Sequence, residues 1–139
     1  MEDEKLSTPR PLTSKETELL AWLLEHGLPE ARTFAPQLKN IRATSRCDSG
    51  CPSISLHVEE GLPLGTSSKT VISDFTGKTS KDKNFGLLLF QKDGKLTLLE
   101  FYELDIMEGN WEFPVLDSLD AWQKAGHSFQ KIGEKWVGL

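Results

Sequence analysis

The sequence predicts an α+β fold in which an N-terminal helical hairpin packs on an antiparallel sheet of about four or five strands, with a short helix near the C-terminus. Three observations predict it. Leucines recur at helical spacing over residues 19–24, the apolar period shortens to that of strands after Ile41, and Asp93-Gly94 is a strong β-hairpin signal.

Length and composition favour a single soluble domain. The chain has 139 residues, of which 37% are hydrophobic and 27% charged, so it can bury a core of its own. We expect residues 1–11 to be a flexible leader and residues 12–139 to form the domain. No apolar run reaches the roughly 18–20 residues that span a bilayer, and the acidic N-terminus lacks the blocks of a signal peptide. These features predict a cytoplasmic protein without a membrane partner.

Capping signals and spacing predict the helical hairpin. Thr13 and Glu16 form a capping-box pattern, and Gly27 supplies a left-handed stop for the first helix. Pro29 suits the first turn of a second helix, in which Pro36 removes a donor, so that helix is short, kinked or split. The inner faces of the two helices carry apolar residues, namely Leu19, Leu20, Leu23, Leu24, Ala31, Phe34, Ala35 and Leu38.

Alternation of apolar and polar residues predicts the strands. Residues 54–58 alternate, a further strand is expected near 69–75, and two strands at 85–90 and 95–102 flank the hairpin turn. The strand at 85–90 has apolar residues on both faces, which is typical of burial on both sides. We therefore place it at the centre of the sheet.

The C-terminal part of the chain is less regular. Asp117 or Ser118 suits the cap of a short helix that carries Leu119 and Trp122. The last stretch, around residues 129–136, fits a helix or a strand equally well. We expect the short helix to end at Gly126.

One stretch concentrates acidic and aromatic residues. Between Lys95 and Lys124 the chain has seven carboxylates, five aromatic residues and no lysine or arginine. Because the formal net charge is -5, the rest of the chain sums to about +2. The candidate partner-binding residues are Glu103, Asp105, Glu108, Trp111 and Glu112. A sheet edge and loop whose carboxylates only keep the protein soluble would explain the same residues.

Charge and large rings together suit a surface that binds a basic protein. Trp111 lies among polar and acidic neighbours and is a candidate interface anchor. A nuclease toxin presents a basic cleft, which an acidic protein can plug by electrostatic steering and ring burial. The pI near 5.2 argues against nucleic acid as a partner. We therefore expect a non-catalytic protein-binding module, namely an acidic immunity or inhibitor protein that neutralises a basic toxin.

The two cysteines support an alternative. Cys47, Cys51 and His57 could serve a small metal- or thiol-dependent enzyme or a metal-binding protein, because thiolates and imidazoles bind zinc. The sequence has no second pair of close ligands, however, and no nucleophile elbow, phosphate loop or zinc-protease motif. Two small apolar residues that bracket a tight turn explain the cysteines more simply. We expect no metal, no other cofactor and no catalytic residue.

Several short motifs follow one another along residues 10–116. In chain order they are Arg10-Pro11-Leu12-Thr13, Trp22-Leu23-Leu24, Gln37-Leu38, Cys51-Pro52-Ser53-Ile54, Leu87-Leu88-Leu89-Phe90, Asp93-Gly94 and Leu99-Glu100 with Tyr102. Together they resemble a family of short bacterial proteins that carries no assigned activity. Such families are often encoded among toxin–immunity neighbourhoods, and this association is all that the resemblance implies. Family members have a denser cysteine cluster at the turn where this chain has Asp48 and Ser49, which argues further against a metal site. No catalytic residue carries over, because the family offers none.

Overall fold

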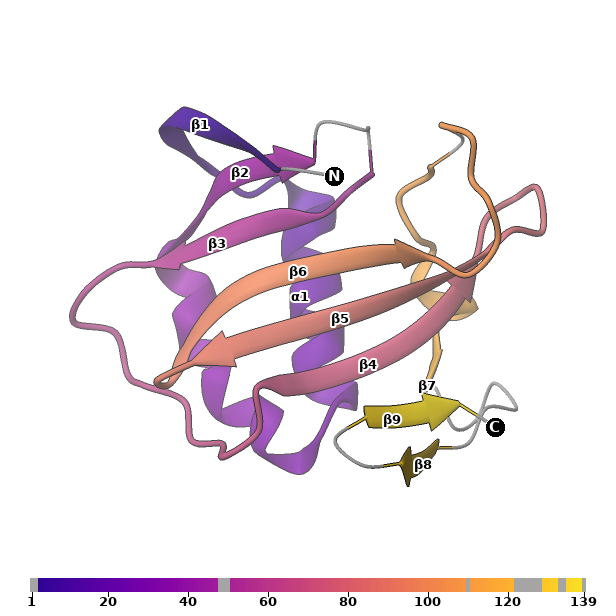
Figure 1. Ribbon diagram of the computed structural model, residues 1–139. Helices are drawn as coiled ribbons and strands as arrows, with labels where there is room; N and C mark the ends of the chain where they lie inside the picture. The colour runs from indigo at the N-terminus through magenta and orange to yellow at the C-terminus, as the bar shows by residue number, and fades with distance from the viewer. Residues whose placement is uncertain (1–2, 48–50, 110, 122–128, 133–134, 139) are drawn as a thin grey trace.

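The computed structural model describes residues 3–47, 51–109, 111–121, 129–132 and 135–138 (Figure 1). In chain order its elements are β1 (Asp3–Pro11), α1 (Ser14–His26), the 3-10 helix η1 (Pro29–Asn40), β2 (Ile41–Cys47), β3 (Ile54–Val58), β4 (Val71–Lys78), β5 (Asn84–Lys92), β6 (Lys95–Glu103), the 3-10 turn η2 (Leu116–Ser118), β7 (Asp120–Ala121), β8 (Phe129–Ile132) and β9 (Lys135–Gly138). Seven strands form one antiparallel sheet in the order β1-β2-β3-β6-β5-β4-β7, and β8 pairs with β9. The α+β class is confirmed, but the prediction of four or five strands is wrong, because β1 and β7 extend the sheet.

Strand β1 occupies the segment that the sequence predicts to be a flexible leader. It pairs with β2 in a register that runs from Asp3 opposite Cys47 to Pro11 opposite Arg42. Pro9 and Pro11 lack backbone donors, which an edge strand tolerates because one of its sides has no neighbour. The segment has no apolar alternation, so its sequence gives no strand signal.

The predicted capping box starts α1. Glu16 N donates to Thr13 Oγ1 over 3.1 Å, and Thr13 N donates to Glu16 Oε1 over 2.9 Å. Arg10 adds two charged hydrogen bonds of 2.9 Å, one to each carboxylate oxygen of Glu16. This bidentate pair joins the end of β1 to the first turn of α1.

Gly27 ends α1 but does not adopt the predicted left-handed conformation, since its φ is -76°. The helix end lies directly on β4, where Ser73 Oγ donates to Leu23 O over 2.7 Å and Leu28 N donates to Ile72 O over 3.0 Å. A Cβ atom at Gly27 would collide with the Ser73 side chain and lie 2.6 Å from Ile72 O. The glycine is therefore needed for close approach rather than for a turn.

The second helix of the predicted hairpin runs as a 3-10 helix with Pro36 inside it. Its buried Gln37 donates from Nε2 to Gly94 O over 2.6 Å and accepts from Leu96 N over 3.1 Å. These bonds fix η1 to the β5–β6 hairpin. The hairpin turn is confirmed, with φ angles of 53° at Asp93 and 83° at Gly94.

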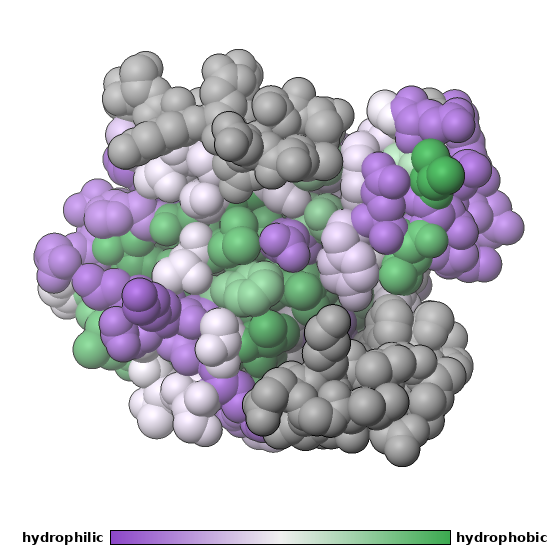
Figure 2. All heavy atoms as spheres, in the orientation of Figure 1, coloured by the Kyte–Doolittle hydropathy of each residue, from purple (hydrophilic) through white to green (hydrophobic). Residues whose placement is uncertain are grey.

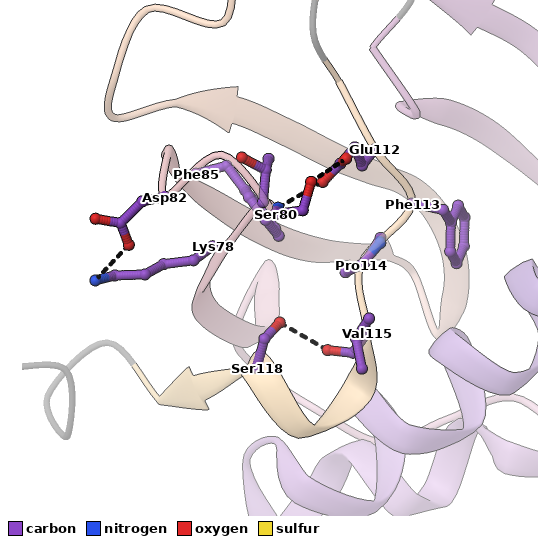
Figure 3. Close-up of a pocket in the computed structure, with 10 residues that line it drawn as sticks. Lys78, Ser80, Asp82, Phe85, Glu112, Phe113, Pro114, Val115 and Ser118 are labelled. Carbon is purple, nitrogen blue, oxygen red and sulfur yellow. Dashed lines mark hydrogen bonds and ion pairs between the residues drawn. The ribbon is translucent and has the colours of Figure 1, made fainter.

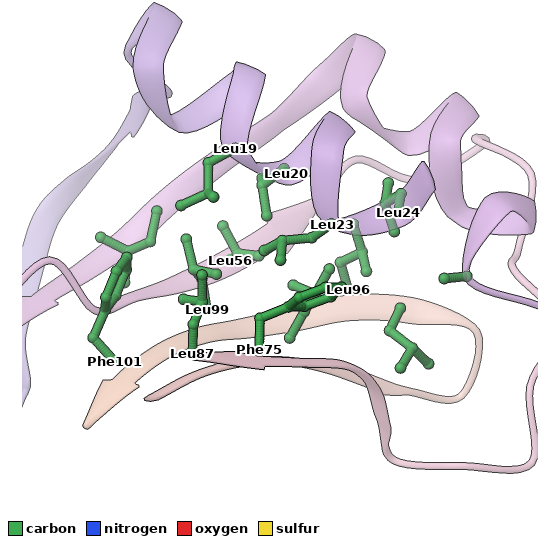
Figure 4. Close-up of a cluster of buried hydrophobic side chains, with 14 of the residues drawn as sticks. Leu19, Leu20, Leu23, Leu24, Leu56, Phe75, Leu87, Leu96, Leu99 and Phe101 are labelled. Carbon is green, nitrogen blue, oxygen red and sulfur yellow. The ribbon is translucent and has the colours of Figure 1, made fainter. Parts of the chain in front are cut away.

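One hydrophobic core lies between the sheet and the helices (Figures 1 and 4). Leucines of α1 pack on inward-facing residues of the central strands, including Leu56, Phe75, Leu87, Leu89, Leu96, Leu99 and Phe101. Strand β5, predicted to be central, lies next to the middle strand β6. Only one face of the sheet is covered by α1 and η1 (Figure 1).

The predicted C-terminal helix is wrong within the described residues. After η2 the chain forms β7, whose Asp120 and Ala121 pair with Thr76 and Phe75 of β4. Leu119 is 6% exposed and belongs to the core, so after the 3-10 turn that contains Asp117 the chain runs extended along β4 instead of continuing as a helix. Trp122 and Gly126 lie outside the described residues, and the ambiguous last stretch forms the β8–β9 hairpin.

Candidate functional site

The predicted partner-binding residues lie at one end of the sheet, in the loop that follows β6. We call residues 103–112 the acidic loop; Asn110 in it lies outside the described residues. The β4–β5 turn lies beside this loop at the right of Figure 1. Two carboxylates connect the loop to β5 and to that turn.

Asp105 holds the start of the loop against β5. Its Oδ2 accepts hydrogen bonds from the backbone N and from Nδ2 of Asn84, each 2.8 Å long. These bonds, together with the positive charges of Lys83 and Lys78, lower the pKa of Asp105. Asp105 is thus a positioning residue, and its carboxylate is already occupied.

Glu112 holds the other end of the loop (Figure 3). Ser80 N donates to Oε1 over 2.7 Å, and Ser80 Oγ donates to Oε2 over 2.6 Å. Both bonds lower the pKa of Glu112, and the charge of Lys81 adds to the effect. The stretch that lacks basic residues in the sequence therefore receives countercharge from a neighbouring turn, which the order of residues along the chain does not indicate.

Trp111 packs inward. Its ring lies 6.2 Å from that of Phe85 and 6.1 Å from that of Phe101 in edge-on or tilted geometry, and the residue is half-buried against the core. A ring held this way supports the loop. It is therefore a weaker candidate for an interface anchor than the sequence suggests.

The exposed apolar groups are elsewhere in the same region. Of the four large hydrophobic residues exposed in the described part of the chain, Leu104, Ile106 and Val115 fall in the acidic stretch, and the fourth is Leu64. Ile106 is the most exposed, at 69%. Figure 2 shows hydrophobic atoms among hydrophilic ones at the upper right, where β6 ends. The sequence already indicates apolar groups in this loop, but it does not show that Met107 turns into the core and Ile106 outward.

Two carboxylates of the loop remain available. Glu103 and Glu108 are exposed, and the carboxylate of neither has a hydrogen bond or ion pair with any residue that the structure describes. Glu108 adopts a φ of 51° and is followed by Gly109 at 80°, so a tight turn places it at the tip of the loop.

A hollow of about 330 Å³ lies between the β4–β5 turn and residues 112–118 (Figure 3). Its polar groups satisfy one another, because Lys78 pairs with Asp82 over 3.2 Å and Ser80 binds Glu112. Phe85 and Phe113 supply apolar walls. Such a hollow offers no activated nucleophile or base.

The candidate metal ligands Cys51 and His57 belong to no metal-binding group among the described residues. Cys51 is buried and disulfide-bonded, so it presents no thiolate, and Cys47 ends β2 with its side chain outside the described residues. His57 is exposed on β3. Among the described residues no group of three His, Cys, Asp or Glu side chains could hold a metal ion.

Comparison with protein-family models, with curated proteins and with solved structures finds no match for this chain. The resemblance of residues 10–116 to a family of short bacterial proteins therefore stays a prediction.

Proposed function

We propose that the protein is a non-catalytic protein-binding module of the immunity type, which neutralises a basic toxin such as a nuclease through the acidic loop. The observation that carries the proposal is Ile106, a large apolar side chain that is 69% exposed between two carboxylates. Exposed apolar groups ringed by charge are typical of protein interfaces.

The anchoring of the loop favours tight binding. Asp105 and Glu112 each accept two hydrogen bonds from β5 or the β4–β5 turn, so the loop is held before a partner arrives. A preorganised loop loses little conformational entropy on association. In this proposal Ile106 and Leu104 enter the partner, while Glu103 and Glu108 steer its basic surface into place.

The five predicted residues therefore have two kinds of role in this proposal, namely contact with the partner and support of the loop. Glu103 and Glu108 contact the partner directly. Asp105 and Glu112 position the loop, and Trp111 supports it from below. The alternative of a metal- or thiol-dependent protein gains no supporting observation from Cys51 or His57.

The compartment stays a prediction. No helix in the described part of the chain is long and apolar enough to cross a membrane. The sequence favours the cytoplasm, whereas the disulfide at Cys51 is a bond that oxidising compartments preserve. Alkylating free thiols at the moment of lysis, followed by mass measurement, distinguishes the two: a cytoplasmic protein should carry two labels per chain.

Co-expression tests the proposed function. A toxin encoded beside the gene should arrest cells, and this protein should restore growth. The variant Glu103→Lys/Glu108→Lys should weaken toxin binding and flatten its dependence on salt, because two steering charges are reversed. Glu18→Lys/Glu25→Lys, on the exposed side of α1, is the matched control and should protect like the natural protein. Full protection by the loop variant would contradict the proposal.

A further inference from the structure

The two faces of the sheet differ in what covers them. Helices α1 and η1 lie on one face, and Figure 2 views the other, where hydrophobic side chains gather in the middle over β5 and β6. We call this second surface the open face. Its residues are Val71, Asp74, Leu88, Phe90, Leu98, Glu100 and Tyr102, and each is half-buried.

Strand pairing fixes the arrangement of these side chains. Leu88 stands between Asp74 of β4 and Glu100 of β6, and the next row on the same face places Phe90 opposite Leu98. Residues directly opposite in an antiparallel pair share a face, and successive rows are two residues apart, or about 7 Å. An apolar row and an acidic row therefore lie side by side.

The open face carries large apolar side chains that the rest of the fold leaves half-exposed. In the run Leu87-Leu88-Leu89-Phe90, Leu87 and Leu89 are fully buried under the helices, while Leu88 and Phe90 remain half-exposed. A run that is apolar on both faces is typical of a strand covered on both sides. In the described part of the chain, α1 and η1 cover only the other face of this strand.

A hollow of about 570 Å³ opens on this face. Its lining includes the apolar residues Phe90 and Leu98, the hydroxyl-bearing residues Ser67, Thr70 and Thr97, and the charged pair Lys92 and Asp93. A hollow of this size has room for an apolar side chain of a partner together with neighbouring atoms of its backbone.

Asp74 supplies an unsatisfied charge beside the hollow. Its Oδ1 is buried with no hydrogen-bond partner among the described residues, and burial raises its pKa to about 6. Tyr102 lies across Gly86 in the neighbouring row, where any Cβ atom at Gly86 would collide with the tyrosine ring. Glu100 is the second carboxylate of the row, and no lysine or arginine of the described chain pairs with either acid. Leaving Oδ1 without a donor is costly, and because Asp74 as a whole is only half-buried, a partner's donor can approach its carboxylate from the open face.

We propose that the open face binds a segment of a partner protein that carries an apolar side chain and, about 7 Å along, a lysine or arginine. The apolar side chain enters the hollow and packs on Phe90 and Leu98. The cation sits on Leu88 and donates to Asp74 and Glu100. Two positions along an extended strand give this spacing.

The chemistry selects this occupant over others. Two carboxylates repel nucleic acid, and a small cation alone would leave the hollow unfilled. The inference rests on the proposed function only in taking the occupant to be a protein. It assigns a surface other than the acidic loop, so the two proposals can fail separately.

A peptide titration followed by amide NMR tests the assignment. The probe is N-acetyl-Leu-Ala-Arg amide, and the matched peptide carries citrulline, which keeps the shape of arginine without its charge. The arginine peptide should shift amide signals of β4, β5 and β6, with the citrulline peptide weaker by about threefold to tenfold. Asp74→Asn should reduce the affinity for the arginine peptide by a similar factor, whereas Asp117→Asn, at an exposed acid, should leave it unchanged.

Three results would overturn the inference. The first is equal binding of both peptides, and the second is shifts confined to the acidic loop or absent up to the solubility limit. The third is a dimer, seen by sedimentation and abolished by Leu98→Asn, which would make a second copy of the chain the occupant. Ile106→Ser serves as a cross-check, since it should weaken toxin binding and leave peptide binding to the open face unchanged.

Discussion

The acidic loop and the open face both carry carboxylates, but these carboxylates differ in hydrogen bonding and in the direction of their pKa shifts. Asp105 and Glu112 each accept two hydrogen bonds, and their pKa values are lowered. Asp74 has an oxygen without a partner, and its pKa is raised to about 6. Carboxylates that accept hydrogen bonds therefore hold the acidic loop in place, whereas the carboxylate of Asp74 has an oxygen that a partner could still bind. The presence or absence of nearby donors makes the difference.

The largest effect should come from Gly86→Ala. The new methyl group would collide with the Tyr102 ring, so we expect a loss of about 2 kcal/mol in the free energy of unfolding, measured with urea. In a Tyr102→Ala background the same substitution should cost clearly less, since the obstacle is gone. Equal costs in both backgrounds would show that the ring does not lie over Gly86.

Asp74→Asn should stabilise the protein at neutral pH. The pKa of Asp74 is raised from 3.8 to about 6, so between these values the folded protein holds a proton that the unfolded chain has released, and stability falls as the pH rises. After allowance for solvent screening we expect a gain of about 1–2 kcal/mol at pH 7. The gain should vanish below pH 3.8. A variant less stable at pH 7 would mean that the carboxylate is satisfied.

Tyr102 reports the charge of the open face directly, because it is the only tyrosine of the chain. Burial, followed by the charges of Asp74 and Glu100, raises its pKa to about 12. Absorbance of the tyrosinate should follow that titration, and Asp74→Asn should lower the midpoint. Circular dichroism recorded in parallel shows whether the protein is still folded at each pH. An ordinary midpoint in folded protein would contradict the placement of the ring.

The smallest effect should come from Asp105→Asn in the acidic loop. Because the folded-state pKa is depressed, the carboxylate contributes stability at neutral pH that is lost as the pH falls through that lowered value. We therefore expect a small decrease in Tm at pH 7 that disappears in acid. Glu103→Gln, at a carboxylate without described partners, is the matched control and should not change Tm.

Local signals in the sequence predicted much of the fold. The capping box at Thr13 and Glu16 and the turn at Asp93-Gly94 formed as expected, because a few neighbouring residues determine each of them. Strands β1 and β7 could not be predicted this way. β1 is polar and held by backbone pairing, and β7 has two residues fixed by the burial of Leu119.

The sequence indicates the acidic loop as a candidate site but not the contacts that hold it. The lysines whose charge lowers the pKa of Asp105 come from the end of β4 and from the turn after it, and Trp111 packs inward on Phe85. Asp74 carries no distinctive sequence signal, since an acid in an alternating strand usually faces water. Its importance depends on Gly86 and Tyr102, which only tertiary pairing brings beside it.

The central claim is that Ile106 on the anchored loop enters a protein partner. Calorimetric titration with the protein encoded by the adjacent gene tests it most directly, using Ile106→Ser and the matched control Leu64→Ser, which removes a similarly exposed apolar side chain from another loop. We predict that Ile106→Ser raises the Kd by about tenfold or more and that Leu64→Ser leaves the Kd unchanged. Equal affinities for the two variants, or no binding by the natural protein, would contradict the account.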